Sequence, residues 1–240
     1  MTGWVAVGRT ATGACAFALQ DVRLVARAVA ANERSALDEL NLPDAPVLRI
    51  GDGAPARLPA PVLPDQGPGL PGFAQDTPPD VIGAWVRVWI AGYLAERPGW
   101  DGVICATEGD VSHWIHVSAD EAVSCQSFLT PRLVQALGGA ATPDADAMAD
   151  SQSRPERLAA HLRAAEVSGN AQAVTGHLIG AELAAARVYW LGQQVAVLAP
   201  SPSPMSAALH HQGVPCEACD PETLVAPGLA EIGKVLGYGV

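Results

Sequence analysis

The sequence predicts an α/β protein with mixed sheets, because short apolar strands alternate with helices along the chain. Two segments, residues 4–20 and residues 102–117, each begin with a pair of strands, as two lobes from a duplicated ancestor would. Between them, Pro98-Gly99 ends a helix and marks the predicted break. The 240 residues are enough for two lobes of ordinary size.

The first hundred residues are predicted to contain strands, two helices and one long loop. Eight prolines lie between Pro55 and Pro79, and proline lacks the backbone N–H that a helix interior or a central strand requires. A loop of this length inside a compact domain is usually functional or disordered. The predicted elements are strands at 4–8, 12–20 and 46–50, a helix over 33–40, the extended loop 51–79, and a helix over 80–96 capped by Asp80.

The remainder of the chain is predicted to alternate between strands and helices. Residues 111–117 alternate in polarity, as a half-buried strand does, and Thr130 precedes Pro131 as a cap precedes the first turn of a helix. The predicted strands are 102–107, 111–117, 122–129, 195–199 and 215–218. The predicted helices are 130–137, 153–166, 171–190, 205–212 and most of 221–237.

The charge of the chain argues against nucleic acid and anionic membranes as partners. There are 14 Lys and Arg residues against 25 Asp and Glu residues, a net charge of −11. No apolar run is long enough to cross a membrane, and no basic segment precedes the apolar residues at the N-terminus. We therefore expect a cytoplasmic protein without a secretory signal.

The five cysteines predict a reducing compartment with free thiols, because their number is odd. Cys216 and Cys219 have the C-x-x-C spacing, but a zinc site needs two further ligands. His210 and His211 are the nearest candidates, and their arrangement does not follow a standard zinc pattern. The favoured interpretation is two small, partly buried residues in a short strand, with a metal site and a redox site as less favoured alternatives.

The segment Thr175-Gly-His-Leu-Ile-Gly-Ala-Glu-Leu183 resembles the T/S-G-x-L-I-G-A-E-L segment of the 2-keto-3-deoxygalactonate kinases, also called 2-dehydro-3-deoxygalactonokinases. The order of elements in the rest of the chain is similar to that family as well. The resemblance implies a two-lobed actin/hexokinase-type (ribonuclease H-like) sugar kinase fold. It places an N-terminal lobe at residues 1–98 and a C-terminal lobe at residues 99–240.

The same resemblance implies an activity and its cofactors. The activity is ATP-dependent phosphorylation of a 2-keto-3-deoxy sugar acid, with ATP and Mg²⁺ as cofactors and the sugar acid as small-molecule partner. A homodimer is left open as the quaternary state.

The first strand pair departs from the family where phosphate and metal are handled. Kinases of the family carry an I-D-W-G-S-T-N-L-R-like run here, and this chain has residues 7–15, with Gly8 in place of the aspartate. A carboxylate that would hold Mg²⁺ is therefore missing. Among the neighbouring residues, Arg9 is left open between anion binding and a surface salt bridge. The resemblance implies cofactor contacts from Arg9, Thr10 and Thr12.

The second lobe of the family opens with P-G-T-H-S-K-W, where this chain has Glu108-Gly-Asp-Val-Ser-His-Trp114. By this resemblance Asp110 is the candidate catalytic residue, which would do the acid or metal work of the carboxylate absent at Gly8. The cofactor-binding candidates that the resemblance implies in this lobe are Gly109, Ser112, His113 and Gly180. For Gly180, four residues after Gly176 on one helix, close packing of that helix is the favoured alternative.

Other family motifs are altered as well. Arg132 replaces the glutamate of M-T-G-E-L, and prolines at 200, 202 and 204 interrupt the segment that matches V-A-G-T/S-S-L. Arg132 and Glu182 are the substrate-binding candidates, and Glu182 is left open between a ligand hydroxyl and a surface or capping role. Residues 83–88 replace R-G-E-E-T-Q and lose both acidic residues of that motif.

Two hypotheses of function follow from the sequence. The first is the sugar-acid kinase that the resemblance implies. The second is a non-catalytic, pseudokinase-like protein that binds a ligand or a partner, because several phosphate-handling residues are changed together.

Overall fold

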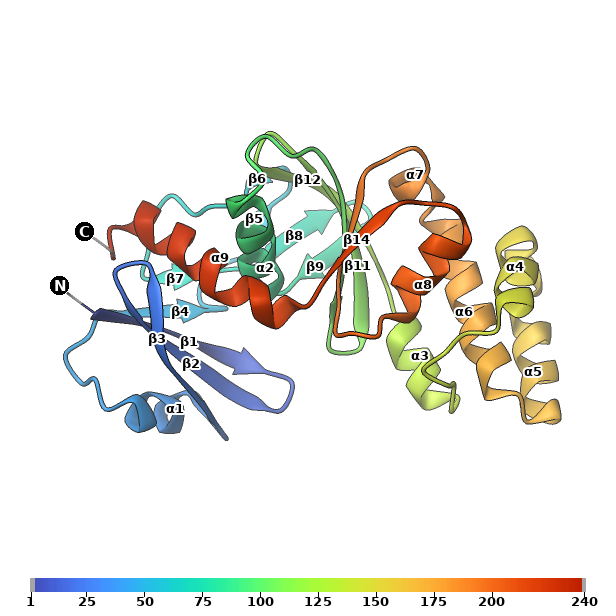
Figure 1. Ribbon diagram of the computed structural model, residues 1–240, viewed down its shortest axis with the longest axis horizontal. Helices are drawn as coiled ribbons and strands as arrows, with labels where there is room; N and C mark the ends of the chain where they lie inside the picture. The colour runs from blue at the N-terminus through green and yellow to red at the C-terminus, as the bar shows by residue number, and fades with distance from the viewer. Residues whose placement is uncertain (1–2, 239–240) are drawn as a thin grey trace. The chain divides into compact units, whose positions relative to one another are not determined.

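The computed structural model describes residues 3–238, which form two compact units (Figure 1). Of the described residues, unit 1 contains 3–100, 117–124 and 221–238, and unit 2 contains 101–116 and 125–220. One domain boundary at residue 98 therefore does not separate the two units, because each unit contains several segments of the chain. The C-terminal helix and the tip of one hairpin pack with the N-terminal residues, and only tertiary contacts create this arrangement.

Unit 1 is built on a five-stranded sheet with the order β3-β2-β1-β4-β7. Its strands are β1 (Gly3–Thr10), β2 (Gly13–Gln20), β3 (Arg23–Ala30), β4 (Val47–Ile50) and β7 (Gly69–Leu70). β1 pairs antiparallel with β2 and parallel with β4, and α1 (Glu33–Leu40) packs against β1, β2 and β3. The predicted strands and helix of this region are confirmed. β3, which the sequence did not predict, is an edge strand whose side chains are mostly exposed.

The proline-rich residues 51–79 are extended but not structureless. They contain β5 (Ala56–Arg57), β6 (Ala60–Pro61), β7 and β8 (Phe73–Asp76), and β5, β8 and β9 (Pro79–Ile82) form a three-stranded sheet. β6 pairs with β12 at the hairpin tip that belongs to unit 1. The helix predicted from Asp80 is wrong at its start, because residues 79–82 pair with β8 and the helix begins after Gly83.

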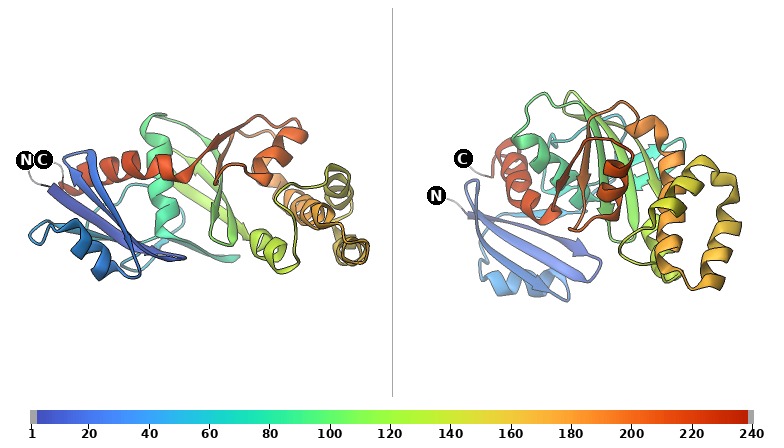
Figure 2. Two further views of the ribbon diagram at one scale, coloured as in Figure 1. Left: turned by 60° about the horizontal axis from the view of Figure 1, so that its bottom comes forward. Right: turned by 45° about the vertical axis from the view of Figure 1, so that its right-hand side comes forward.

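Two helices of unit 1 cross at glycines. α2 (Ala84–Ala95) packs against α9 (Pro221–Leu236), as Figure 2 shows. A Cβ at Gly92 would lie 2.1 Å from the backbone O of Leu224, and one at Gly228 would lie 2.1 Å from the backbone O of Val88. The two backbones therefore touch at a distance that only glycine permits.

Arg87 of α2 holds the proline-rich segment in place. Its side chain is buried, and it donates hydrogen bonds to the carbonyl oxygens of Val62 (2.8 Å), Pro71 (3.0 Å) and Pro61 (3.0 Å). The guanidinium also lies 4.8 Å from the centre of the Phe73 ring. Burial lowers the pKa of Arg87 to about 10, so the guanidinium remains charged at neutral pH.

Unit 2 is built around five strands of a six-stranded sheet with the order β14-β13-β10-β11-β12-β6. The strands are β10 (Gly102–Glu108), β11 (Val111–Ser118), β12 (Glu121–Phe128), β13 (Val195–Leu198) and β14 (Cys216–Cys219). β13 runs parallel to both β10 and β14. All five strands were predicted from the sequence. The cysteines at both ends of β14 are partly buried free thiols.

The helices of unit 2 are α3 (Thr130–Ala136), α4 (Ala145–Ser153), α5 (Leu158–Ser168), α6 (Ala171–Ala185), α7 (Arg187–Trp190) and α8 (Pro204–His211). α4 and α5 both pack against α6 (Figure 2). α4 was not predicted from the sequence, and the helix predicted over 153–166 begins only after the short 3₁₀ turn Pro155–Arg157. Thr130 is the first helical residue of α3 rather than its cap, because the cap position belongs to Leu129.

Gly176 and Gly180 are the contact points of α6 with α4. A Cβ at Gly176 would lie 2.4 Å from the backbone O of Asp144, and one at Gly180 would lie 2.2 Å from the backbone O of Met148. The two glycines therefore allow the helix backbones to touch, which is the packing interpretation of this motif.

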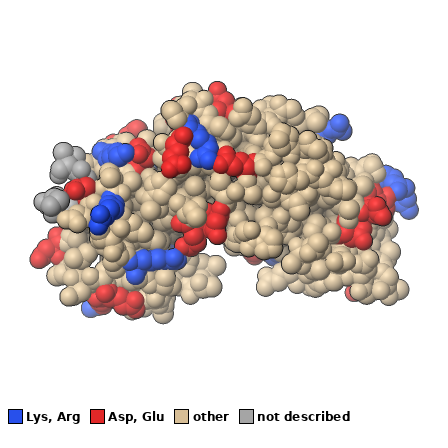
Figure 3. All heavy atoms as spheres, in the orientation of Figure 1, with Lys and Arg blue, Asp and Glu red and all other residues tan. Residues whose placement is uncertain are grey.

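Within residues 3–238, no helix is both long enough and apolar enough to span a bilayer. The face drawn in Figure 3 carries acidic and basic side chains near one another and no extended basic patch. This distribution agrees with the net charge of −11.

Candidate functional site

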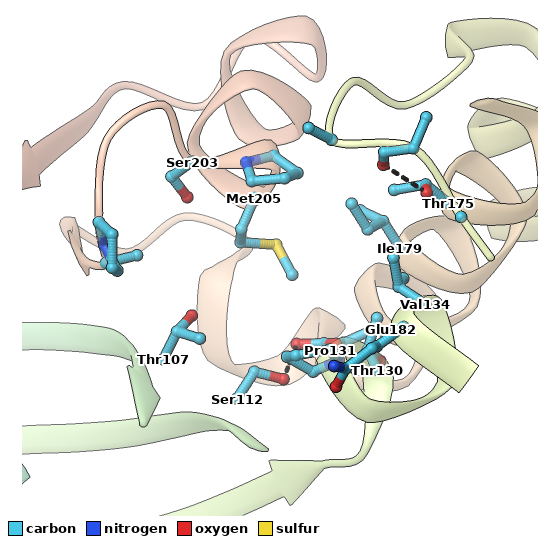
Figure 4. A pocket seen from close by; sticks show the side chains of 17 residues that line it. Thr107, Ser112, Thr130, Pro131, Val134, Thr175, Ile179, Glu182, Ser203 and Met205 are labelled. Carbon is cyan, nitrogen blue, oxygen red and sulfur yellow. Dashed lines mark hydrogen bonds between the residues drawn. The ribbon is translucent and has the colours of Figure 1, made fainter. Parts of the chain in front are cut away.

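Unit 2 contains a pocket of about 410 Å³ where β10 and β13 end (Figure 4). Thr107 near the end of β10 and Ala199 just after β13 form one side of it. α3, α6 and the beginning of α8 form the others. Because β10 and β13 are parallel, their carboxyl ends meet at one edge of the sheet, where α/β proteins commonly bind ligands.

The walls of the pocket are mostly apolar. Val134 of α3, Ile179 of α6 and Met205 of α8 all line it, and Figure 4 shows their side chains around the open space. The prolines of residues 200–204 shape one side, and Ser203 ends this segment by capping α8, since its Oγ accepts a hydrogen bond from the backbone N of Ser206 (3.3 Å). Proline and the cap leave this wall with few backbone donors.

Glu182 is the acidic residue of this pocket, and its side chain is only 2% exposed. Its Oε1 accepts hydrogen bonds from Ser112 Oγ and from Trp114 Nε1, both at 2.8 Å. Its Oε2 is buried and has no hydrogen-bond partner among the described residues. Burial raises the pKa of Glu182, and the side chains of Thr130, Trp114 and Ser112 oppose this shift. Glu182 is thus buried within unit 2, in neither a surface nor a helix-capping position.

The other polar side chains of the pocket are largely engaged. Thr175 Oγ1 donates to the backbone O of Ala140 at 2.7 Å, and Ser112 Oγ donates to Glu182. The hydroxyl hydrogens of Ser112 and Thr175 are therefore directed into the protein. The pocket offers a carboxyl group, and an anionic ligand group next to it would be repelled whenever Glu182 is ionised.

Asp110, the candidate catalytic residue, is bound to Arg132, a candidate for substrate binding. Arg132 Nε lies 2.5 Å from Oδ2 of Asp110, and Arg132 Nη2 lies 3.0 Å from Oδ1. This two-pronged ion pair lowers the pKa of Asp110, chiefly through the hydrogen bond from Arg132. Each side chain therefore neutralises the other, and neither of them lines the pocket.

Two cofactor-binding candidates lie on either side of Asp110. Gly109 occupies the turn between β10 and β11 with φ of +59°, a conformation that favours glycine. His113 points into the protein, where its Nδ1 lies 2.6 Å from Ser127 Oγ and its side chain is almost completely buried. Its Nε2 lies 3.8 Å from Glu108. The ring is therefore held by β12 and by the end of β10.

The candidates in unit 1 lie around the turn between β1 and β2. Arg9 is 88% exposed at its side chain, and its Nε lies 3.6 Å from Glu33. Thr10 ends β1, and Thr12 is exposed in the turn. The surface ion pair of Arg9 is one of the two interpretations that the sequence left open.

Gly8 has no space for a side chain. A Cβ at this position would lie 2.7 Å from both Cβ and O of Ile50, and 3.1 Å from Cζ2 of Trp85. Trp85 is fixed there, because its Nε1 donates a hydrogen bond of 2.7 Å to the backbone O of Arg9. The space next to Gly8 is thus filled by unit 1 itself, so restoring an aspartate would require this packing to move.

Of the candidate residues, the structure brings Ser112 and Glu182 together in the pocket and pairs Asp110 with Arg132. Gly180 contacts α4 instead of the pocket. Thr175 and Ile179 also line the pocket, and neither was predicted as a site residue from the sequence. Their spacing from Glu182, seven and three residues along one helix, is the signal that could have found them.

The residues described here do not fit a protein-held Mg²⁺ ion. No group of three or more His, Cys, Asp or Glu side chains in residues 3–238 is arranged to hold a metal. The position of the family aspartate is a glycine without free space, and Asp110 is paired with Arg132. We therefore derive no step through a metal ion.

No protein-family profile and no curated protein matches the chain. Among solved structures, it is similar to a proposed 2-dehydro-3-deoxygalactonokinase from Sinorhizobium meliloti, with a TM-score of 0.81, 20% identity, and coverage of 96% of this chain and 98% of that one.

Two further solved structures are similar at 10% identity. One is component A of the (R)-2-hydroxyglutaryl-CoA dehydratase from Acidaminococcus fermentans, with a TM-score of 0.52 over 98% of this chain and 99% of that one. The other is the activator of the 2-hydroxyisocaproyl-CoA dehydratase from Clostridium difficile with bound ADPNP, with a TM-score of 0.50 over 95% and 92%. At these identities the likeness establishes the fold alone, and it confirms the actin/hexokinase-type α/β fold expected from the sequence.

Proposed function

We propose that this protein binds an adenine nucleotide and that the nucleoside half of the nucleotide occupies the unit 2 pocket. The observation that carries the proposal is the pocket itself, which lies at the carboxyl ends of two parallel strands. Its volume of about 410 Å³ is in the range of small-molecule sites, and its apolar walls suit a planar base. The structural relative with bound ADPNP supports the choice of an adenine nucleotide.

The pocket is poorly suited to the sugar acid. A sugar-acid carboxylate would lie beside the buried carboxyl of Glu182, and the hydroxyls of Ser112 and Thr175 already donate elsewhere. A neutral nucleoside carries no such charge. We therefore assign Glu182 to the cofactor rather than to the substrate, which changes the role that the sequence resemblance implied.

The reaction that we propose for the protein is ATP-dependent phosphorylation of a 2-keto-3-deoxy sugar acid. Its support is the likeness in fold to the proposed 2-dehydro-3-deoxygalactonokinase over almost the whole chain. In unit 2, Gly109 is the proposed contact to the phosphates, and within unit 1, taken by itself, Arg9, Thr10 and Thr12 are the candidates for binding an anion. Arg9 is well suited to an anion because its guanidinium is mostly exposed.

A second function has specific support. The filled space beside Gly8 and the pairing of Asp110 with Arg132 both favour a protein that binds nucleotide without transferring phosphate. In that case nucleotide binding would serve to control a ligand or a partner. The two functions share the pocket and differ in turnover.

Calorimetry of the purified protein with ATP, with and without Mg²⁺, tests the shared proposal. We expect saturable binding of ATP and of adenosine, and absence of binding of both would contradict the proposal. A coupled assay for ADP release with a panel of 2-keto-3-deoxy sugar acids then separates the two functions. Sugar-acid-dependent ADP release supports the kinase, whereas binding without turnover supports the non-catalytic function.

A matched pair of variants locates the binding site. Gln135 is exposed and lines the mouth of the pocket on α3, and the next residue, Ala136, is exposed and does not line it. We expect Gln135→Trp to obstruct the pocket and to weaken ATP binding at least tenfold, which corresponds to about 1.4 kcal/mol. Ala136→Trp should bind as the unchanged protein does. Equal binding by both variants would place the nucleotide elsewhere.

A further inference from the structure

One carboxyl oxygen of Glu182, Oε2, is buried without a hydrogen-bond partner among the described residues. The other oxygen of the same carboxyl group receives two donors, Ser112 and Trp114. A buried polar atom without a partner raises the free energy of the protein. A ligand that completes this group would recover that free energy.

The chemistry of the missing partner follows from the two states of the carboxyl group. If Glu182 is ionised, Oε2 accepts, and the ligand must donate a hydrogen. If it is protonated, the two donors on Oε1 leave the hydrogen on Oε2, and the ligand must accept. A hydroxyl group does both, whereas an amino group conjugated to a base ring only donates and a carboxylate only accepts.

We infer that Glu182 selects ribonucleotides, because one hydroxyl of the ribose binds its Oε2. This inference rests on the proposed binding of an adenine nucleotide and adds the feature of the ligand that is recognised. The walls formed by Val134, Ile179 and Met205 hold the base by apolar contact. They offer no side-chain hydrogen bond that could replace the one to the ribose.

The position of Glu182 is well fixed, as recognition of a single hydroxyl requires. Ser112 and Trp114 hold the carboxyl group from β11, and both of these residues are themselves buried. Glu182 lies on α6, whose close contact with α4 at Gly176 and Gly180 limits movement of the helix. A deoxynucleotide would therefore leave Oε2 without the hydrogen bond that the ribose hydroxyl provides.

Calorimetry with ATP, 2′-deoxy-ATP and 3′-deoxy-ATP tests the inference on the unchanged protein. We expect one of the two deoxynucleotides to bind at least about tenfold more weakly than ATP, because its complex leaves Oε2 without a partner. Equal affinity for all three nucleotides would overturn the inference while leaving nucleotide binding intact. Absence of binding by ATP and adenosine would instead contradict the proposed function itself.

The variant Glu182→Met provides a second measurement. Methionine has a similar length and no hydrogen-bonding carboxyl group, so the preference for ATP over the deoxynucleotide should fall to about onefold. ATP should then bind as weakly as the deoxynucleotide binds to the unchanged protein. Retention of the full preference in a folded Glu182→Met protein would overturn the inference. If the variant does not fold, the nucleotide series on the unchanged protein remains decisive.

Discussion

The rings of His161 and His177 stack with their centroids 4.7 Å apart, and Ser151 bridges them. Ser151 Oγ lies 2.9 Å from Nδ1 of His161 and 2.8 Å from Nδ1 of His177, and it is completely buried. Nε2 of His161 lies 3.2 Å from Oδ2 of Asp150. α4, α5 and α6 therefore meet in a hydrogen-bonded cluster of two histidines and a serine.

Ser151 lies between the two rings, and the direction of each hydrogen bond depends on which ring nitrogen carries the hydrogen. Nε2 of His161 faces the carboxylate of Asp150, which only accepts hydrogen bonds. Protonation of His177 would introduce a positive charge next to the stacked ring of His161.

We expect stability to fall in mild acid because of His177. Burial, followed by the charge of His161, lowers the pKa of His177 in the folded protein, while a hydrogen bond with the backbone of Ala147 and the charges of Asp150 and Asp144 oppose the shift. The unfolded chain thus binds the proton at a higher pH than the folded protein. The stabilising contribution is therefore present above about pH 6.5, the usual pKa of histidine, and is lost as the pH falls below it.

Urea unfolding between pH 8 and pH 5 measures this effect. His177→Gln should make the free energy of unfolding less dependent on pH in that range than in the unchanged protein. His211→Gln, at an exposed position of α8, is the matched control and should leave the dependence as it is. The same pH dependence in the unchanged protein and in His177→Gln would show that His177 does not carry the effect.

Gly180→Ala should destabilise the protein, although alanine is the better helix former. Helix propensity alone favours alanine by about 1 kcal/mol. The new Cβ, however, would lie 2.2 Å from the backbone O of Met148, so α4 and α6 must separate, at a cost of about 1–3 kcal/mol. Thermal unfolding of Gly180→Ala beside Ala185→Ser, an exposed change on the same helix, measures the difference. A stabilised Gly180→Ala protein would disprove the close contact.

Arg87→Lys should cost about 1–3 kcal/mol, although the charge is kept. Lysine lacks the three guanidinium nitrogens that donate to the carbonyl oxygens of Val62, Pro61 and Pro71 at the same time. Buried acceptors therefore lose their donors. Chemical denaturation provides the free energy of unfolding. Arg34→Lys, an exposed change on α1, should stay within about 0.5 kcal/mol of the unchanged protein. Equal values for the two variants would argue against Arg87 as the support of the proline-rich segment.

Gly8→Asp should destabilise unit 1 instead of restoring a kinase. The added side chain meets Ile50 and Trp85 at distances that require one of them to move, at a cost of about 1–3 kcal/mol. A drop in melting temperature, without new ADP release in the presence of Mg²⁺ and sugar acid, is the expected result. Thr12→Asp, in the exposed turn nearby, adds the same charge without the clash and should melt near the unchanged protein. A stable and newly active Gly8→Asp protein would refute this reading of the packing.

The sequence by itself determined much of the fold. The β1–β2 pair, α1, and the five strands of unit 2 follow from runs and alternations of apolar residues, which are local properties. The resemblance of the α6 segment, together with the order of elements, predicted the fold that the solved structures share. Elements without a clear local pattern were not predicted, as with the exposed edge strand β3 and the small-residue helix α4.

The candidate site depended on tertiary structure. The sequence named Ser112 and Glu182 separately, but only the fold brings a β11 hydroxyl within 2.8 Å of an α6 carboxyl and leaves the other oxygen without a partner. Likewise, the absence of an aspartate at position 8 is visible in the sequence, whereas the filled space beside it is not. Burial and hydrogen bonding arise between residues far apart in the chain, and local patterns carry no information on those distances.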